Sequence, residues 1–236
     1  MEKVNLSVSV KLSQDLLWDV KLEKNTKSLQ NQLKDLPKST LAADLSSQEE
    51  AMAFWLNVYN AFIQIALQTK AEQYANKSKF FTSRWIPIAG QHLSFDDIEH
   101  GILRRSQFKY GFGYVPKPWL GAFEKKFRLT CKDPRIHFAL NCGAKSCPPI
   151  RFYSPPEIDS QLNQATQNYL EQECRYDALE NKLYLSRLFL WFRGDFGSRK
   201  SLRKFLQKYG AMPPAVKSKI KYLDYDWELF LGNYSP

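Results

Sequence analysis

Residues 133–149 bring together several side chains that are suited to covalent chemistry. They include His137, one of three histidines in the chain, and Cys142 and Cys147, two of its four cysteines. A cysteine activated by a histidine attacks acyl groups when hydrogen-bond donors stabilise the oxyanion that forms. We therefore expect a thiol-dependent hydrolase or acyl transferase that acts on an amide, ester or thioester.

Each role in such a reaction has a candidate in the sequence. Cys147 is the expected nucleophile, because it ends a glycine-containing loop whose backbone amides are suited to binding an oxyanion. His137 is the expected base, and His100, next to Glu99, is the alternative base. Cys142 begins the same loop and belongs to the candidate site. The candidate amides for orienting the base and binding the oxyanion are Asn57, Asn60 and Asn141.

The position of His137 on the expected backbone restricts which thiol it can reach. Apolar and other residues alternate over residues 136–141, the period-two pattern of a strand with one buried face. On a straight strand His137 and Cys142 point to opposite faces, whereas His137 and Asn141 share a face. His137 then reaches Cys147 only if the loop folds back over the polar face of the strand.

Three other uses of the same side chains remain open. His137, Cys142 and Cys147 could bind zinc with His100, but the usual pair of cysteines separated by two residues is missing, so we expect no metal and no cofactor. The loop between the two cysteines is short enough for a reversible disulfide to form, although the spacing of the cysteines does not match redox motifs. In the third, the cluster is structural and the protein is a non-catalytic interaction or ligand-binding module.

A long apolar helix is expected to carry two of the candidate amides. Ser47 and Glu50 have the spacing of a capping box, and residues 51–67 contain no charged residue. The polar exceptions in this span are Asn57, Asn60 and Gln64. They fall on one stripe of the helix and argue against a membrane span. Because a buried amide without a partner costs about 1–3 kcal/mol, this stripe needs either a polar site or backbone groups as partners.

The remaining patterns predict long helices mixed with short strands. We expect helices over residues 16–36, 94–103, 154–169 and 198–209. We also expect a hairpin over residues 85–93 and strands over residues 183–185 and 220–223. The absence of regular strand–helix–strand repeats favours the α+β class, with several long helices packed around a small mixed or antiparallel sheet. We expect one compact domain, in which residues 1–44 form an N-terminal helical extension on a core of residues 45–236.

Composition is that of a basic globular protein. The 236 residues are 44% hydrophobic and carry a net charge of +10. The basic clusters at residues 104–105, 199–204 and 217–221 are separate, so no specific nucleic-acid partner is expected. The first residues lack the pattern of a secretion signal, which favours a cytoplasmic location and reduced thiols. The expected partner is a small-molecule or peptide ligand, and the sequence carries no signal for an oligomeric state.

Residues 133–149 closely resemble the signature of the family catalogued as domain of unknown function 547, found in bacteria and plants. Further blocks that resemble this family, in the same order, are residues 54–61, 93–94 with 98–104, and 191–192 with 195–196. Together they span about residues 45–230. The resemblance implies that the residues of these blocks belong together in one fold, but it implies no reaction.

Overall fold

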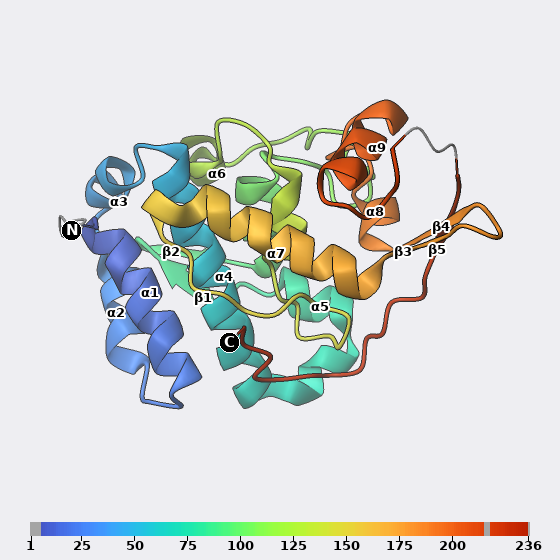
Figure 1. Cartoon of the computed structure of the whole chain (residues 1–236). Coiled ribbons are helices and arrows are strands. Elements are labelled where there is room, and N and C mark those ends of the chain that lie inside the picture. Colours follow the sequence, from blue (N-terminus) through green and yellow to red (C-terminus); the bar gives the residue numbers. More distant parts are fainter. Residues whose placement is uncertain (1–5, 215–217, 236) are drawn as a thin grey trace, which may run out of the picture.

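The chain folds into a single α+β domain in which helices pack around two small sheets (Figure 1). The computed structural model describes residues 6–214 and 218–235. Its longer helices are α1 (Val8–Lys21), α2 (Lys27–Asp35), α4 (Gln48–Lys70), α7 (Ile158–Glu173) and α9 (Arg199–Lys208), and its shorter ones are α3 (Lys38–Asp44), α5 (Lys77–Thr82), α6 (Ala122–Phe127) and α8 (Leu188–Trp191). The expected fold class is confirmed. Met1–Asn5 of the expected extension and Lys217 of one basic cluster lie outside the described residues.

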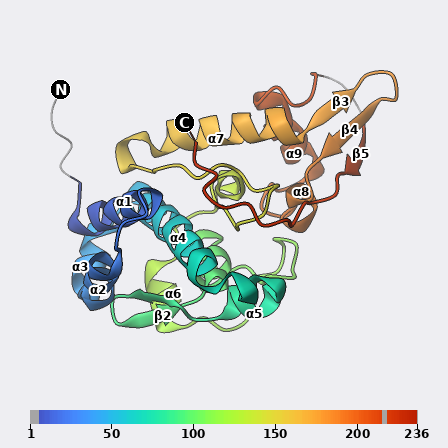
Figure 2. The ribbon, with the colours of Figure 1, turned by 90° about the horizontal axis from the view of Figure 1, so that it is seen from below.

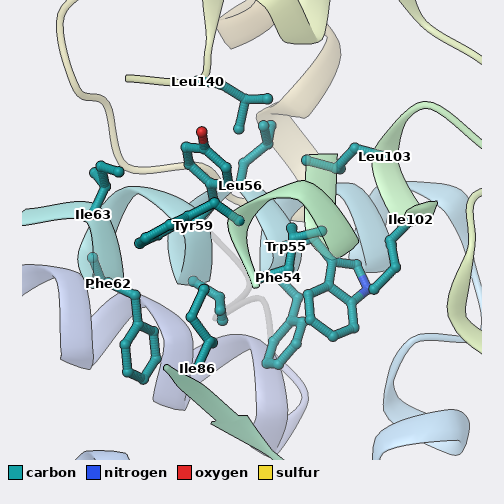
Figure 3. Close-up of a cluster of buried hydrophobic side chains, with 14 of the residues drawn as sticks. Phe54, Trp55, Leu56, Tyr59, Phe62, Ile63, Ile86, Ile102, Leu103 and Leu140 are labelled. Carbon is teal, nitrogen blue, oxygen red and sulfur yellow. The ribbon is translucent and has the colours of Figure 1, made fainter. Parts of the chain in front are cut away.

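Helix α4 is the centre of the domain. The Ser47 hydroxyl accepts a hydrogen bond from the Glu50 N–H, and the Glu50 carboxylate accepts one from the Ser47 N–H, which confirms the predicted capping box. Side chains such as Trp55 and Tyr59 are buried all around the helix and form the main core with neighbouring elements (Figure 3). Figure 2 shows α4 between α1–α3 on one side and α8 with its neighbouring sheet on the other. Among the described residues, no helix is long and apolar enough to cross a membrane.

The helix expected over residues 16–36 is wrong, because the chain forms two helices there. Glu23 adopts a left-handed φ of 54° after α1. The Lys24 N–H donates to the Asp19 carbonyl at 2.9 Å, a bond typical of a helix C-terminus that has turned out of the helix. This turn lets α2 fold back, and the carbonyls of Leu33 and Lys34 accept hydrogen bonds from the N–H groups of Ala89 and Gly90. Helix α1 itself packs along α4.

The strand expected over residues 136–141 is also wrong. Residues Pro134–Phe138 form a 3-10 helix, and the chain then runs irregularly to residue 150. Asp133 begins the 3-10 helix by accepting a hydrogen bond from the Arg135 N–H at 2.9 Å. His137 is buried as fully as Ile136 and Phe138, so the alternation of residue types did not reflect alternating burial. The argument from strand faces for the reach of His137 therefore does not apply.

The two sheets are small. Strands β1 (Ile86–Ile88) and β2 (Gln91–Leu93) form the predicted hairpin, with Ala89 and Gly90 at positive φ in its turn. In the second sheet β4 (Lys182–Leu185) lies between β3 (Arg175–Asp177), which is antiparallel to it, and β5 (Lys219–Tyr222), which is parallel. The sheet is therefore mixed, and β3 is the strand that the sequence pattern did not predict.

The chain after β5 crosses the body of the domain as an extended segment, residues 223–235, which we call the C-terminal strap (Figure 1). Its backbone bonds to the irregular chain after the 3-10 helix. The Lys145 N–H donates to the Glu228 carbonyl at 2.8 Å, and the Phe230 N–H donates to the Gly143 carbonyl at 2.9 Å. Farther along, the Ile150 N–H donates to the Asn233 carbonyl at 2.7 Å. The strap thus holds the loop that carries the thiols.

Candidate functional site

A cavity of about 590 Å³ opens where the π-helix Asp97–Leu103, the 3-10 helix Pro134–Phe138, α5, α8 and the strap meet. Eight of its 19 lining residues are Phe, Tyr or Trp: Tyr59, Phe81, Tyr110, Phe112, Trp191, Phe192, Tyr225 and Trp227. Its polar and ionisable lining residues are Lys77, Ser78, Asp96, Glu99, His100, Lys109, His137 and Cys142. Four of the residues predicted for the site, Glu99, His100, His137 and Cys142, thus border one cavity.

His137 is held by a carboxylate and an aromatic ring. Its Nε2 lies 3.0 Å from Asp195 Oδ2, and its ring stacks on Phe192 with centroids 4.0 Å apart and planes at 7°. The side chain is only 1% exposed, so it borders the cavity by one edge. Among the described residues, Nδ1 has no hydrogen-bond partner. An ionised Asp195 favours the proton on Nε2, which leaves Nδ1 as the basic nitrogen.

Asp195 is kept ionised by its neighbours. Arg104 Nε donates to Asp195 Oδ2 at 2.6 Å, and Lys132 Nζ lies 3.4 Å from Oδ1. Burial raises the pKa of Asp195, but the contacts with His137 and Arg104 outweigh burial and hold that pKa well below its usual value. Burial lowers the pKa of His137 more than Asp195 raises it, so the imidazole is neutral near neutral pH.

His100 supports this arrangement and is not free to act as a base. Arg104 Nη1 lies 2.9 Å from His100 Nδ1, and because arginine only donates, Nδ1 is the acceptor. The proton then lies on Nε2, which is 3.7 Å from Asp96 Oδ1. Burial, followed by the charge of Arg104, holds the pKa of His100 well below its usual value.

Glu99 is the ionisable group of the cavity whose pKa lies near neutrality. Its carboxylate makes no hydrogen bond to the described residues, and the nearest nitrogen of a basic side chain is His100 Nδ1, 3.6 Å from Oε1. Burial raises the pKa of Glu99 to about 7, and the opposing effect of Arg104 is smaller. A carboxyl group with this pKa is suited to giving and taking protons at neutral pH.

The two thiols of the loop touch each other. Cys142 Sγ and Cys147 Sγ lie 2.6 Å apart, and the Tyr225 hydroxyl lies 3.3 Å from Cys147 Sγ and 3.6 Å from Cys142 Sγ. Cys147 Sγ also accepts the N–H of Cys142 at 3.0 Å. Cys142 borders the cavity, whereas Cys147 is 5% exposed and lies behind it. Both cysteines are free thiols.

These contacts determine which of the two sulfurs loses its proton first. Burial raises the pKa of Cys147, but hydrogen bonds from Cys142, Tyr225 and backbone amides outweigh burial, so that pKa is lowered. The pKa of Cys142 is raised well above its usual value, first by its hydrogen bond to Cys147 and then by burial. Cys147 is therefore the sulfur that takes the negative charge, and Cys142 is the sulfur that keeps the proton. Among the described residues, no hydrogen bond joins either thiol to a histidine.

The loop between the thiols has little freedom. Gly143 has a φ of +85°, and a Cβ there would lie 2.3 Å from Cδ1 of Leu67. The Asn141 side chain spans the loop, because its Nδ2 donates to the Pro148 carbonyl at 2.9 Å and its Oδ1 accepts the Gly143 N–H at 2.9 Å. A glycine at 143 is thus required by both the backbone conformation and the close approach of α4.

The three predicted amides lie outside the cavity wall. Asn57 exchanges hydrogen bonds with the backbone N–H and carbonyl of Tyr153, both at 2.9 Å. Asn60 Nδ2 donates to the Ala139 carbonyl and its Oδ1 accepts the Asn141 N–H, both at 3.0 Å. Both amides of α4 therefore hold the segment that follows the 3-10 helix. Of the two kinds of partner expected for this stripe, a polar site or backbone groups, these amides bind backbone groups.

Several residues of the site were not predicted. Asp195 and Arg104 lie in blocks that resemble the family, so that signal was present, but nothing in their spacing points to His137. Tyr59 was not among the predicted site residues, yet it borders the cavity, and Figure 3 shows its hydroxyl directed toward Leu140. Burial holds the pKa of Tyr59 well above its usual value, so the hydroxyl keeps its proton and can donate it. Tyr225 lies on the irregular strap, which has no periodic signal.

Within residues 6–214 and 218–235, no group of three or more His, Cys, Asp or Glu side chains is arranged to hold a metal ion.

Comparison with known proteins gives a family but no activity. Residues 43–170, more than half of the chain, match the family model described as "Protein of unknown function, DUF547". A short segment of 58 residues is 36% identical to trans-L-3-hydroxyproline dehydratase of Mus musculus. The aligned segment covers 24% of this chain and only 16% of that protein. No solved structure matches the chain. The family match includes Glu99, His137 and both thiols, and the chain belongs to the DUF547 family of proteins of unknown function.

Proposed function

We propose that this protein is a thiol-dependent enzyme that hydrolyses or transfers an acyl group, with Cys142 as the nucleophile. One observation carries the proposal: Cys142 borders the same cavity as His137, whose Nε2 is fixed by Asp195 and whose Nδ1 is unoccupied. A nucleophile, a base and a group that orients the base are the parts that acyl transfer through a covalent intermediate requires.

Cys142 is preferred to Cys147 because it is the thiol that a ligand can reach. Cys147 instead acts as the proton acceptor for Cys142, since its sulfur lies 2.6 Å away and is the sulfur of the pair that loses its own proton first. As the Cys142 sulfur bonds to the carbonyl carbon, its proton passes to the Cys147 thiolate and the carbonyl electron pair moves to oxygen. The Tyr59 hydroxyl is the candidate donor to that oxyanion.

Glu99 and His137 complete the cycle. The protonated carboxyl of Glu99 gives its proton to the leaving group as the tetrahedral intermediate collapses to a thioester on Cys142. His137 Nδ1 then takes a proton from the attacking water or acceptor, and the Cys142 thiolate leaves and recovers its proton from Cys147. Return of the proton from His137 to Glu99 restores the starting state, so no group is consumed.

A covalent trapping experiment tests this proposal. A p-nitrophenyl ester added to the full chain at neutral pH should leave an acyl group on Cys142, identified by intact mass and peptide mapping. Cys142→Ala should abolish the adduct, and Cys147→Ala should slow its formation because the proton acceptor is lost. Cys174→Ala is the matched control, since this half-buried thiol lies outside the cavity.

Acylation of Cys131 or Cys174 at the same rate as Cys142 would contradict the assignment. A chain whose Cys142 never acylates, with several ester and thioester donors, would favour the alternative in which the cavity binds a ligand without turnover.

A further inference from the structure

We propose that the cavity selects a small amphiphilic anion, with an aromatic or apolar body between the aromatic walls and an anionic group bound by Lys77. This inference deepens the proposed function by naming the class of its substrate. Binding requires no turnover, so the two can be tested separately.

Lys77 is the cation of the cavity that has no carboxylate partner among the described residues. The other lysine, Lys109, is neutralised by Asp96, whose Oδ2 lies 2.7 Å from its Nζ. Lys77 Nζ instead donates to the Tyr74 carbonyl at 2.8 Å and lies 3.5 Å from the centroid of the Tyr74 ring. Those contacts orient the ammonium group but leave its charge uncompensated.

The position of Lys77 relates the charge to the reacting thiol. The ammonium group lies 5.8 Å from the centroid of the Trp227 ring and 3.5 Å from that of Tyr74, whose hydroxyl donates to the Cys142 carbonyl at 3.1 Å. An anionic group on Lys77 is therefore held at the same end of the cavity as the nucleophile. A substrate that carries its charge close to its acyl carbon fits this arrangement.

The walls define the rest of the ligand. Trp191, Tyr225 and Trp227 form a cluster with ring centroids 4.9–5.9 Å apart, and Tyr225 also contacts both thiols. A flat aromatic or apolar body beside this cluster gains contact area without needing polar partners. A neutral ligand of the same shape would cover Lys77 without neutralising it, which is unfavourable. A cationic ligand would be repelled.

A matched pair of fluorescent probes tests the inference on the full chain. 8-Anilinonaphthalene-1-sulfonate and N-phenyl-1-naphthylamine share an aromatic body and differ by the sulfonate. The protein should bind the sulfonate more tightly, and Lys77→Met should weaken that binding about tenfold, the loss expected for one charge-assisted contact, while changing the affinity for the uncharged probe by less than about twofold. The control is Lys79→Met, on the same helix and exposed but outside the cavity wall, which should bind both probes like wild type.

Two further measurements determine where the probe binds and which type of anion the site accepts. At a concentration near its wild-type Kd, the sulfonate probe should slow iodoacetamide labelling of Cys142 in wild type and should slow it much less in Lys77→Met. Displacement of the probe by 2-naphthoate identifies a carboxylate ligand, displacement by 2-naphthyl phosphate identifies a phosphate ligand, and either supports an anion site. Displacement by neither would overturn the inference.

An unchanged affinity for the sulfonate probe in Lys77→Met, or an equal loss for both probes, would also overturn it. If Lys77 controls the binding of anions but Cys142 never acylates, the anion site stands and the proposed acyl chemistry fails. If Cys142 acylates but Lys77→Met shows no charge-dependent loss, the reverse holds.

Discussion

The imidazole of His137 is clamped between the Phe192 ring, 4.0 Å from its own centroid, and the Asp195 carboxylate, 3.0 Å from its Nε2. Stacking fixes the plane of the imidazole, and the carboxylate fixes its rotation and its tautomer. The base is therefore already oriented before any ligand binds. Because both contacts come from the turn after α8, that turn sets the direction in which Nδ1 points.

The first prediction concerns Asp195. Asp195→Asn should slow hydrolysis of the Cys142 thioester by a factor of at least about 100, because an amide no longer fixes the tautomer that leaves Nδ1 basic. The measurement is the decay of the acyl-enzyme in a single turnover. Lys132→Gln, which removes the weaker and more exposed partner of Asp195, is the control and should decay at the wild-type rate.

Because Asp195 also pairs with buried Arg104, the folded fraction of Asp195→Asn must be checked by thermal unfolding. A folded variant that deacylates like wild type would remove His137 from the mechanism.

The second prediction separates the two thiols. Iodoacetamide should label Cys142 before Cys147, since Cys142 borders the cavity and Cys147 lies behind it. Labelling of Cys142 should begin at a higher pH than for an ordinary thiol, because the hydrogen bond to Cys147 and burial raise the pKa of Cys142 well above its usual value. In Cys147→Ala the same labelling should shift to lower pH, since the contact with Cys147 is the largest cause of the raised pKa of Cys142. Faster labelling of Cys147 in folded wild-type protein would reverse the roles and restore Cys147 as the nucleophile.

The third prediction concerns the stability contributed by Glu99. Its folded-state pKa of about 7 lies above the value of 4.5 for an unperturbed glutamate, so the folded chain holds this proton more tightly than the unfolded chain. The corresponding stability is fully present below pH 4.5 and is lost as pH rises toward 7, by up to about 3 kcal/mol. Urea unfolding at pH 5 and pH 8 should show this loss in wild type and a smaller loss in Glu99→Gln. Glu171→Gln, at an exposed position on α7, should keep the wild-type difference.

Equal pH dependence in wild type and Glu99→Gln would show that the carboxyl is not buried in solution. Acylation should follow the same titration, falling as Glu99 loses its proton above about pH 7.

The fourth prediction concerns oxidation of the thiol pair. With sulfurs 2.6 Å apart, oxidised glutathione should convert Cys142 and Cys147 to a disulfide, releasing two molecules of reduced glutathione. The oxidised chain should lose two hydrogens in mass, resist alkylation at Cys142 and fail to acylate, and dithiothreitol should reverse all three changes. Cys147→Ala should give at most a mixed disulfide. Full alkylation of Cys142 after such treatment would contradict a redox-sensitive pair.

The sequence predicts the helices well where local signals are strong. The capping box at Ser47 and Glu50 and the core face of α4 depend on spacings of three and four residues, which are readable without tertiary structure. The strand over residues 136–141 failed because its signal, alternation, assumes that one face is exposed. His137 is buried on the second side by Phe192, a residue far along the chain that no local pattern includes.

In the candidate site, too, local features could be predicted from the sequence and contacts between distant residues could not. Glu99, His100, His137 and Cys142 were found because their side-chain types are suited to catalysis. Asp195 is separated from His137 by 58 residues and from Arg104 by 91, so its contacts depend on the folding of the whole domain. The amides of α4 were assigned by type to an oxyanion, whereas their bonds go to backbone carbonyls and N–H groups that no sequence pattern identifies in advance.

The C-terminal strap is the last part of the site to be synthesised. Tyr225 and Trp227 are made after every other residue of the cavity wall, and the backbone bonds of the strap to Gly143 and Lys145 can form only then. On a ribosome, the remaining wall is complete while the thiol loop still lacks its fastening and Cys147 lacks the Tyr225 hydroxyl. The proposed reactive thiol would therefore reach its final surroundings only after translation has passed the rest of the domain.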